Sequence, residues 1–239
     1  MSLRILAIDT SFESCSAALH SDGQMYERHT EQPRQHAQRI LPMVHELLQQ
    51  AGITLSQVEL MVFGRGPGAF TGLRIAAGVV QGLAFGAAIP VLPVSSLALL
   101  AQQAYTEKGW RHCHVAVDAR MGEVYWGSFS ILHNGTIELL GSEAVLPPDQ
   151  IRFSSNLDGN NEYYGVGSGW AFRQQLEQGC GSVLDCDCTI QPRASSLITL
   201  AQKQIGTASL QHCDAIIQAH EVAPVYLRNN VAAKPGAGK

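Results

Sequence analysis

A pattern that occurs twice constrains the fold of this 239-residue chain more than any other feature of its sequence. The stretch LAIDTSFESCSAAL, residues 6–19, and the stretch HVAVDARMGEVYWGSF, residues 114–129, share one order of apolar and polar positions. In each, an alternating apolar segment ends at an aspartate, Asp9 or Asp118, and a second apolar strand starts six residues later. Such a repeat is typical of a duplicated unit. It predicts an α/β protein with two similar lobes and a cleft between them, lined by the ends of the first strands.

The boundaries of the lobes are predicted from the point where the pattern starts again. We expect an N-terminal lobe at residues 1–108, a C-terminal lobe at 109–231 and a disordered tail at 232–239, where the sequence is AAKPGAGK. Each lobe is expected to contain a hairpin, because the dipeptides Asp22-Gly23 and Asn134-Gly135 favour tight turns between strands.

Three helices are expected in the first lobe. Residues 36–52 have a broad amphipathic pattern, with Gly52 as the C-terminal cap and with Pro42 expected to kink the helix or to mark its true start. The other two helices are expected from about Phe70 to Ala87 and from about Ser96 to Glu107. In the second lobe, the sequence predicts a loop at 154–161, a strand, a glycine turn and a helix start at 163–170, and a helix near 194–205.

Composition argues against a nucleic-acid-binding face made of clustered basic residues. Only 15% of the residues are charged and the formal net charge is −4, whereas phosphate binding relies on clustered Lys and Arg. Residues 75–105 carry no charge, but Gln, Pro and Ser interrupt them, so we expect two buried helices flanking a strand and no membrane span. The first residues do not have the pattern of a secretory signal, and we expect a cytoplasmic protein with six reduced cysteines.

The loop GRGPGAFTGLR, residues 64–74, contains four glycines and must need close backbone approach or positive φ angles. A Walker phosphate loop is excluded, because the first lysine of the chain is Lys108. A dinucleotide fingerprint needs an acidic residue about 20 positions further on, and none lies between Glu59 and Glu107. We therefore interpret the loop as a structural start for the helix that follows, and only secondarily as a phosphate cradle.

Gly78, Gly82 and Gly86 recur every four residues along one face of that helix. Each glycine in a helix interior costs about 1 kcal/mol relative to alanine, or roughly 3 kcal/mol for the three. The expected compensation is the close approach of another backbone. The spacing leaves open whether that backbone belongs to the core of this chain or to a partner helix.

Five motifs in the same order resemble the TsaB (also called YeaZ) family. They span about residues 3–231 and read ILAIDTS, HAQRILPMVHELL, GRGPGAFTGLR, VDARMGEVYW and PVYLRNNVA. The resemblance implies a duplicated two-lobe α/β fold of the actin, hexokinase and Hsp70 ATPase class (RNase H-like), in agreement with the repeat. It also implies a role in making threonylcarbamoyladenosine in tRNA, on the adenosine 3′ of the anticodon. In that family the protein is the partner of a catalytic paralogue, TsaD, and works with TsaE, a small P-loop ATPase.

Comparison with TsaD-type paralogues implies that this chain is not an enzyme. Those paralogues have a helix that starts N-H-x-E-x-H, in which two histidines bind a metal. The matching stretch here is VSSLALLA, residues 94–101, which puts Ser96 and Leu100 at the histidine positions and Ala98 at the glutamate position. Serine is a poor metal ligand, and leucine and alanine cannot coordinate a metal at all. We therefore expect no metal site, no catalytic residue and no cofactor.

The nucleotide-binding pattern of the class is incomplete as well. The first strand of such proteins normally ends in D-x-G-[TS], whereas this chain has Asp9-Thr10-Ser11 and, in the second copy, Asp118-Ala119-Arg120. Because arginine can bind phosphate, weak nucleotide binding in the cleft stays open, with Asp9, Thr10, Ser11, Asp118 and Arg120 as candidates. The alternative is that the two aspartates only hydrogen-bond turn amides at the ends of their strands.

We therefore expect a scaffold subunit whose first two helices dock the TsaD-type paralogue or, in its absence, a second copy of this chain. tRNA is expected to bind only through the complex. Two rival hypotheses stay open: a small-molecule kinase or ATPase that uses Asp9 or Asp118 as general base with Mg²⁺, and a metallopeptidase. The residues expected to contact the partner are Arg39, Ile40, Met43, Leu47, Arg74, Gly78, Gly82 and Gly86.

Overall fold

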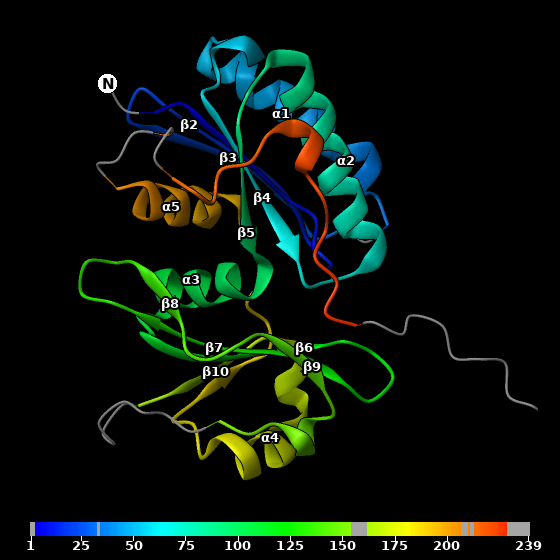
Figure 1. Ribbon diagram of the computed structural model, residues 1–239, viewed down its shortest axis with the longest axis vertical. Coiled ribbons are helices and arrows are strands. Elements are labelled where there is room, and N and C mark those ends of the chain that lie inside the picture. The colour runs from blue at the N-terminus through cyan, green and yellow to red at the C-terminus, as the bar shows by residue number, and fades with distance from the viewer. Residues whose placement is uncertain (1–2, 33, 154–161, 207–209, 211–212, 229–239) are drawn as a thin grey trace, which may run out of the picture.

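Two β-sheets with corresponding strand orders form the two lobes of the protein (Figure 1). The computed structural model describes residues 3–32, 34–153, 162–206, 210 and 213–228. The first sheet has the order β3-β2-β1-β4-β5 and the second the order β11-β10-β6-β7-β8, with β9 paired to β7. The strands of the first sheet are β1 (Ile5–Asp9), β2 (Cys15–Ser21), β3 (Gln24–Thr30), β4 (Leu60–Gly66) and β5 (Val91–Ser95). Those of the second are β6 (His112–Asp118), β7 (Val124–Ile131), β8 (Ile137–Leu139), β9 (Ala144–Leu146), β10 (Tyr164–Val166) and β11 (Cys186–Asp187).

The pairing of the strands confirms the duplication. In the first sheet β1, β2 and β3 form an antiparallel meander, and β1 also pairs in parallel with β4. In the second sheet β6, β7 and β8 form the same meander, and β6 pairs in parallel with β10. Strands β1 and β6 therefore hold equivalent places, and each ends at the aspartate that the repeated pattern marks, Asp9 or Asp118.

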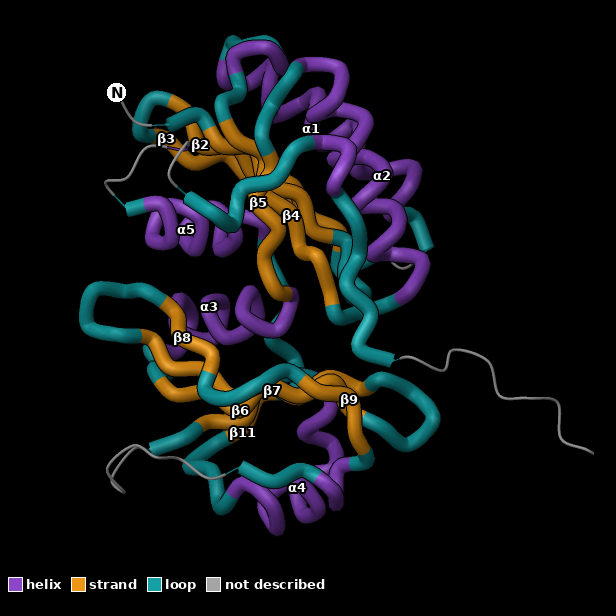
Figure 2. The backbone as a smooth tube through the Cα atoms, in the orientation of Figure 1, coloured by secondary structure: helices purple, strands orange, loops and turns teal. Residues whose placement is uncertain are grey.

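The helices cover the sheets in layers (Figure 2). Helices α1 and α2 lie on the outer face of the first sheet, α5 and α3 lie between the two sheets, and α4 lies on the far face of the second sheet. Short 3-10 turns connect the layers at Leu55–Gln57 (η1), Pro148–Gln150 (η2), Ser168–Phe172 (η3) and Ala219–Glu221 (η5). The helices are α1 (His36–Ala51), α2 (Phe70–Ala87), α3 (Ser96–Lys108), α4 (Arg173–Cys180) and α5 (Ala194–Ile205).

The ends of the predicted helices agree closely with the structure. Gly52 caps α1 in the left-handed conformation, with φ 66°, as its sequence position predicts. Pro42 lies inside the uninterrupted helix and so does not mark its start. The expected loop at 154–161 and the expected tail at 232–239 lie outside the described residues.

The placement of α5 corrects the predicted boundary between the lobes. Although α5 follows the second sheet in the sequence, its side chains Leu197 and Ile198 belong to one buried cluster with Ile5 and Ala18 of the first sheet. Helix α3 lies against both sheets: its Leu100 belongs to the apolar core of the second sheet, and its Leu99 belongs to the cluster of the first sheet and α5. A division at residue 109 therefore separates the two sheets but places α5 apart from the sheet on which it packs.

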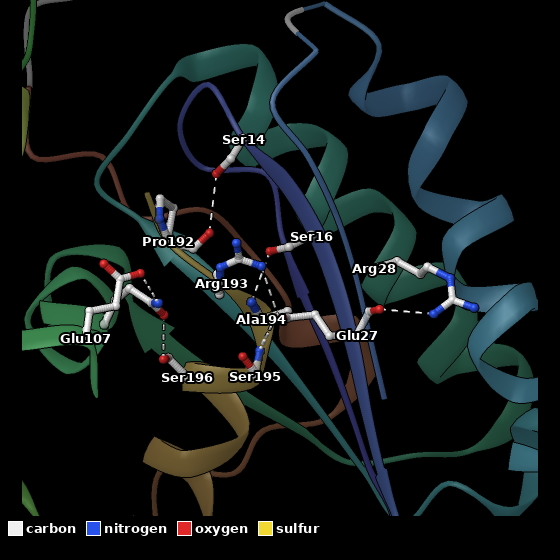
Figure 3. A network of polar contacts seen from close by, with 11 residues as sticks. Ser14, Ser16, Glu27, Arg28, Glu107, Pro192, Arg193, Ala194, Ser195 and Ser196 are labelled. Atoms are coloured by element: carbon white, nitrogen blue, oxygen red, sulfur yellow. Dashed lines mark hydrogen bonds and ion pairs between the residues drawn. The ribbon is translucent and has the colours of Figure 1, made fainter. Parts of the chain in front are cut away.

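Polar contacts hold the N-terminus of α5 on the first sheet (Figure 3). The Ser16 hydroxyl on β2 accepts a hydrogen bond from Ala194 N at 3.0 Å, and the Glu27 carboxylate on β3 accepts one from Ser195 N at 2.9 Å. The Arg193 guanidinium pairs with Glu27 as well, at 3.4 Å. These acceptors satisfy N–H groups that have no partner within the helix, and a carboxylate is favourable beside a helix N-terminus.

Ser16→Ala removes the acceptor for the buried Ala194 N–H, and we expect the free energy of unfolding to fall by about 1–3 kcal/mol. The matched control is Ser14→Ala, because the Ser14 hydroxyl donates to the Pro192 carbonyl at 3.4 Å, near the limit of a useful hydrogen bond. Urea unfolding of the two variants measures the difference. Equal losses would show that the Ser16 contact does not anchor α5.

Candidate functional site

The glycine-rich loop packs against the turn that joins β1 to β2. A Cβ atom added at Gly68 would lie 2.3 Å from the carbonyl oxygen of Ser11, and one added at Gly72 would lie 2.0 Å from that of Thr10. Hydrogen bonds join the same segments: Ala69 N donates to Ser11 O at 2.8 Å, and the Thr10 hydroxyl donates to Gly72 O at 2.7 Å. The glycines are therefore needed for contact within this chain, and carbonyl oxygens occupy the space beside them.

The carboxylate of Asp9 is enclosed by the same packing. It is fully buried, it accepts a hydrogen bond of 2.7 Å from the Ser11 hydroxyl, and a Cβ at Gly64 would lie 2.1 Å from its Oδ1. Burial raises the pKa of Asp9 from 3.8 to about 6, although hydrogen bonds from Ser11 act in the opposite direction. Asp9, Thr10 and Ser11, which the sequence places in the cleft, are thus fully buried beneath it and do not line it.

A cleft of about 590 Å³ lies between the lobes. Its walls include Phe12 and Phe70 from the first lobe and Tyr125 from the second. Asp118 and Arg120 line it as well, so the structure brings this predicted pair to the cleft. The Asp118 carboxylate accepts hydrogen bonds from Arg120 N at 2.8 Å and from its guanidinium at 3.2 Å. Both carboxylate oxygens therefore already bind groups of the turn that follows β6. This agrees with the alternative that the aspartate at this strand end only holds its own turn.

The residues at the metal-binding positions of TsaD-type proteins have structural contacts here. The Ser96 hydroxyl accepts a hydrogen bond from Gly66 N at 3.1 Å, while Ala98 and Leu100 belong to the apolar core under the second sheet. Across the described part of the chain, no three or more His, Cys, Asp or Glu side chains are grouped so that they could hold a metal ion. All six cysteines are free thiols. The absence of a metal and a cofactor stays a prediction.

The outer face of α2 carries the glycine stripe Gly78, Gly82 and Gly86. All three residues are exposed, and a Cβ atom added at any of them would have no neighbour within 4 Å in the described structure. The inner face, which includes Val80 and Ala84, packs on the first sheet. Of the two alternatives that the spacing leaves open, close packing of the stripe inside the core of this chain is therefore wrong.

By its length and apolar composition alone, helix α2 could cross a membrane: its 18 residues have a mean hydropathy of 1.3, and 33% of them are buried. Core helices of soluble proteins can have the same length and composition. Because one face of α2 packs on the sheet, the apolar composition has a structural use in the fold. The expectation that the protein does not span a membrane stays a prediction.

The apolar face of α1 supports the fold and does not form an exposed surface. Ile40 and Leu47 are fully buried and Met43 is 8% exposed, and all three belong to the core between α1 and the first sheet. Their expected contact with a partner is corrected accordingly, because a buried side chain cannot reach another protein. Arg39 is exposed on α1 and Arg74 on α2, and their role in partner binding stays a prediction.

The structure adds a C-terminal segment that the sequence does not single out as a functional element. After η5 the chain runs past the cleft, where Val225 N donates to Arg65 O at 2.7 Å and Arg228 pairs with Glu123 of the second lobe. Residues 225–228 line the cleft. The only signal in the sequence is the stretch PVYLR, residues 224–228, and its residue types do not by themselves indicate a contact with α2.

The duplicated sheets and the cleft between them define a two-lobe α/β protein of the actin, hexokinase and Hsp70 ATPase class. A family model described as TsaD, tRNA N6-adenosine threonylcarbamoyltransferase, matches residues 29–235. The chain is 40% identical over 241 residues to the tRNA threonylcarbamoyladenosine biosynthesis protein TsaB of Escherichia coli (strain K12), with 99% of this chain and 100% of that protein covered. It belongs to the TsaB family.

Two further comparisons agree with this assignment. The TsaB protein of Haemophilus influenzae is 38% identical over 246 residues, covering 99% of this chain and 98% of that protein. A solved structure of YeaZ from Pseudomonas aeruginosa superposes with a TM-score of 0.84 at 44% identity, covering 95% of this chain and 100% of that one. The family and fold that the five motifs predict are confirmed.

Asp9→Asn should make stability less dependent on pH. Because the pKa of Asp9 is about 6 in the folded protein and 3.8 as its ordinary value, the folded state binds the proton more tightly, and the ionised carboxylate destabilises it above pH 6. Between pH 4 and pH 8 this shift corresponds to about 2–3 kcal/mol. We therefore expect the free energy of unfolding of Asp9→Asn, relative to wild type, to rise by about that amount over the range. A difference that does not change with pH would contradict the burial of this charge.

Proposed function

We propose that this chain is a partner subunit without catalytic activity in the biosynthesis of threonylcarbamoyladenosine in tRNA, and that the outer face of α2 docks the catalytic TsaD-type paralogue. The role in this biosynthesis is supported by relatives that match over nearly their full length and are tRNA threonylcarbamoyladenosine biosynthesis proteins. The docking proposal is carried by one observation, the open glycine stripe on an apolar helix.

The helix stability that the three glycines cost supports the binding of a partner at the stripe. Three glycines in a helix interior cost roughly 3 kcal/mol relative to alanine, and no contact in the described chain offsets that cost. Large apolar side chains are exposed on the same pair of helices, with Phe85 78%, Leu41 47% and Phe70 45% exposed. Exposed apolar surface beside a row without side chains favours another helix that approaches closely.

The same face supports self-association when the paralogue is absent. An isologous contact is the commonest route to a homodimer, and a standard interface of this kind buries on the order of 1,600 Å² in total. A TsaE-type ATPase and tRNA then engage the complex rather than this chain alone, in the cytoplasm. The low charge content supports this indirect role for tRNA.

The chain alone should bind ATP and Mg²⁺ at most weakly and release no phosphate. Asp9 is buried away from the cleft, and the Asp118 carboxylate is engaged by Arg120, so neither is free to act as a general base. Isothermal titration followed by a phosphate-release assay measures both properties. Turnover that Asp118→Asn abolishes would establish the rival kinase or ATPase function instead.

Gly82→Leu should weaken docking without loss of folding. The new side chain points into open space in the free chain, and leucine favours helix over glycine, so the melting temperature of the monomer should stay the same or rise by about 2–3 °C. A partner backbone at the stripe would be displaced, which should weaken binding of the TsaD-type paralogue roughly 5- to 150-fold.

The matched control is Gln204→Leu, which adds the same side chain to an exposed position of α5, away from α2. Calorimetry gives the melting temperature, and a titration of the paralogue gives the Kd. If the Gly82→Leu variant binds the paralogue with unchanged affinity, the proposed docking face is wrong, whatever the effect on stability.

A further inference from the structure

Arg74 continues the glycine stripe toward the N-terminus of α2. It lies four residues before Gly78, so Arg74, Gly78, Gly82 and Gly86 form one row along the helix. It is also the only charged residue of α2. On α2 itself, a partner that approaches along the glycines therefore meets a single charge, at one end of the row.

Two aromatic side chains hold the Arg74 guanidinium in place. Its Cζ lies 3.7 Å from the centroid of the Phe70 ring, and its Nε donates a hydrogen bond of 3.1 Å to the Tyr226 hydroxyl. The two rings contact each other, with 5.6 Å between their centroids. Neither ring neutralises the charge, and within the described residues Arg74 has no carboxylate partner and its two terminal nitrogens make no hydrogen bond.

An arginine held in this way is suited to bind a carboxylate. The contact with the Phe70 ring and the hydrogen bond to Tyr226 restrict the guanidinium. Because Nε is bound to Tyr226, the two terminal nitrogens are left as a fork that matches the two oxygens of a carboxylate. Much of the side-chain entropy that an ion pair normally costs is already lost before a partner arrives. The contact would lie at the end of the glycine row, beside an apolar surface.

We propose that Arg74 pairs with a carboxylate of the protein that docks along the α2 stripe, and that this pair selects the partner. The partner's surface is then an apolar helix with an acidic side chain near one end. The proposal rests on the proposed function, since it names the chemistry of the partner at that same face.

A second copy of this chain fits this requirement poorly. Helix α2 has no Asp or Glu, and the sequence has none between Glu59 and Glu107. Two copies packed stripe to stripe would place each Arg74 against an apolar helix, and a charge that loses water without gaining a partner opposes association. Arg74 therefore favours a different protein over self-association at this face.

Arg74→Gln tests the proposal, with binding of the TsaD-type paralogue and self-association measured in parallel. We expect the Kd for the paralogue to rise about 10- to 100-fold, as for loss of a charged, bidentate hydrogen bond, while self-association stays the same or tightens. The wild-type Kd should also depend more steeply on salt than that of the variant. Arg74→Lys keeps the charge but not the planar fork and should bind with intermediate affinity.

The matched control is Arg152→Gln, an exposed arginine beside η2 in the second lobe. Melting temperatures report whether the variants fold, and Tyr226→Phe, which keeps the charge and releases only Nε, gives a milder test with an expected rise in Kd of a few-fold. If Gly82→Leu weakens binding but Arg74→Gln does not, the ion pair is overturned and the docking face stands. If neither weakens binding, both are overturned. If Arg74→Gln weakens self-association as much as it weakens binding of the paralogue, the proposed selection of a different partner is overturned.

Discussion

The contact between the β1–β2 turn and the glycines after β4 fixes the arrangement on which the rest of the first lobe depends. The carbonyl oxygens of Thr10 and Ser11 lie where the Cβ atoms of Gly72 and Gly68 would be in any other residue. Only glycine permits this approach, and it brings the end of the central strand against the first turn of α2. The direction of α2 follows, and with it the face that the helix presents to the outside. The same contact encloses Asp9, so the packing that positions α2 also removes a carboxylate from the cleft.

Local signals in the sequence were sufficient for the main elements of the first lobe and for the duplication, but not for β9, β11 and α4 of the second lobe. Alternation of apolar residues and the hairpin dipeptides located β1, β2, β6 and β7, and the amphipathic period located α1. Periodicity identifies which face of a helix is buried but not which sheet covers it. For this reason the sequence predicted α5 at residues 194–205 but assigned it to the wrong packed unit, and it could not tell that Ile40 and Leu47 of α1 serve the core.

The candidate site was predictable only where its parts are close in the sequence. The glycines of α2 are visible as a row, yet the open space around them appears only when the neighbouring elements are in place. The contact between Arg74 and Tyr226 joins residues 152 positions apart, and no local pattern relates them. Asp9 was located correctly at a strand end, but its depth is set by a loop that follows more than fifty residues later.

The packing of α5 on the first sheet has a consequence for the order in which the molecule can assemble. The inner face of the first sheet, with Ile5, Leu60 and Val62, is covered by a helix that the chain reaches only at residues 194–205. A nascent chain that ended before α5 would hold a sheet with one apolar face in water, which is a template for misassembly. The lobe that is synthesised first is therefore the last to be completed. Its core forms through contacts between distant parts of the chain, which slows folding.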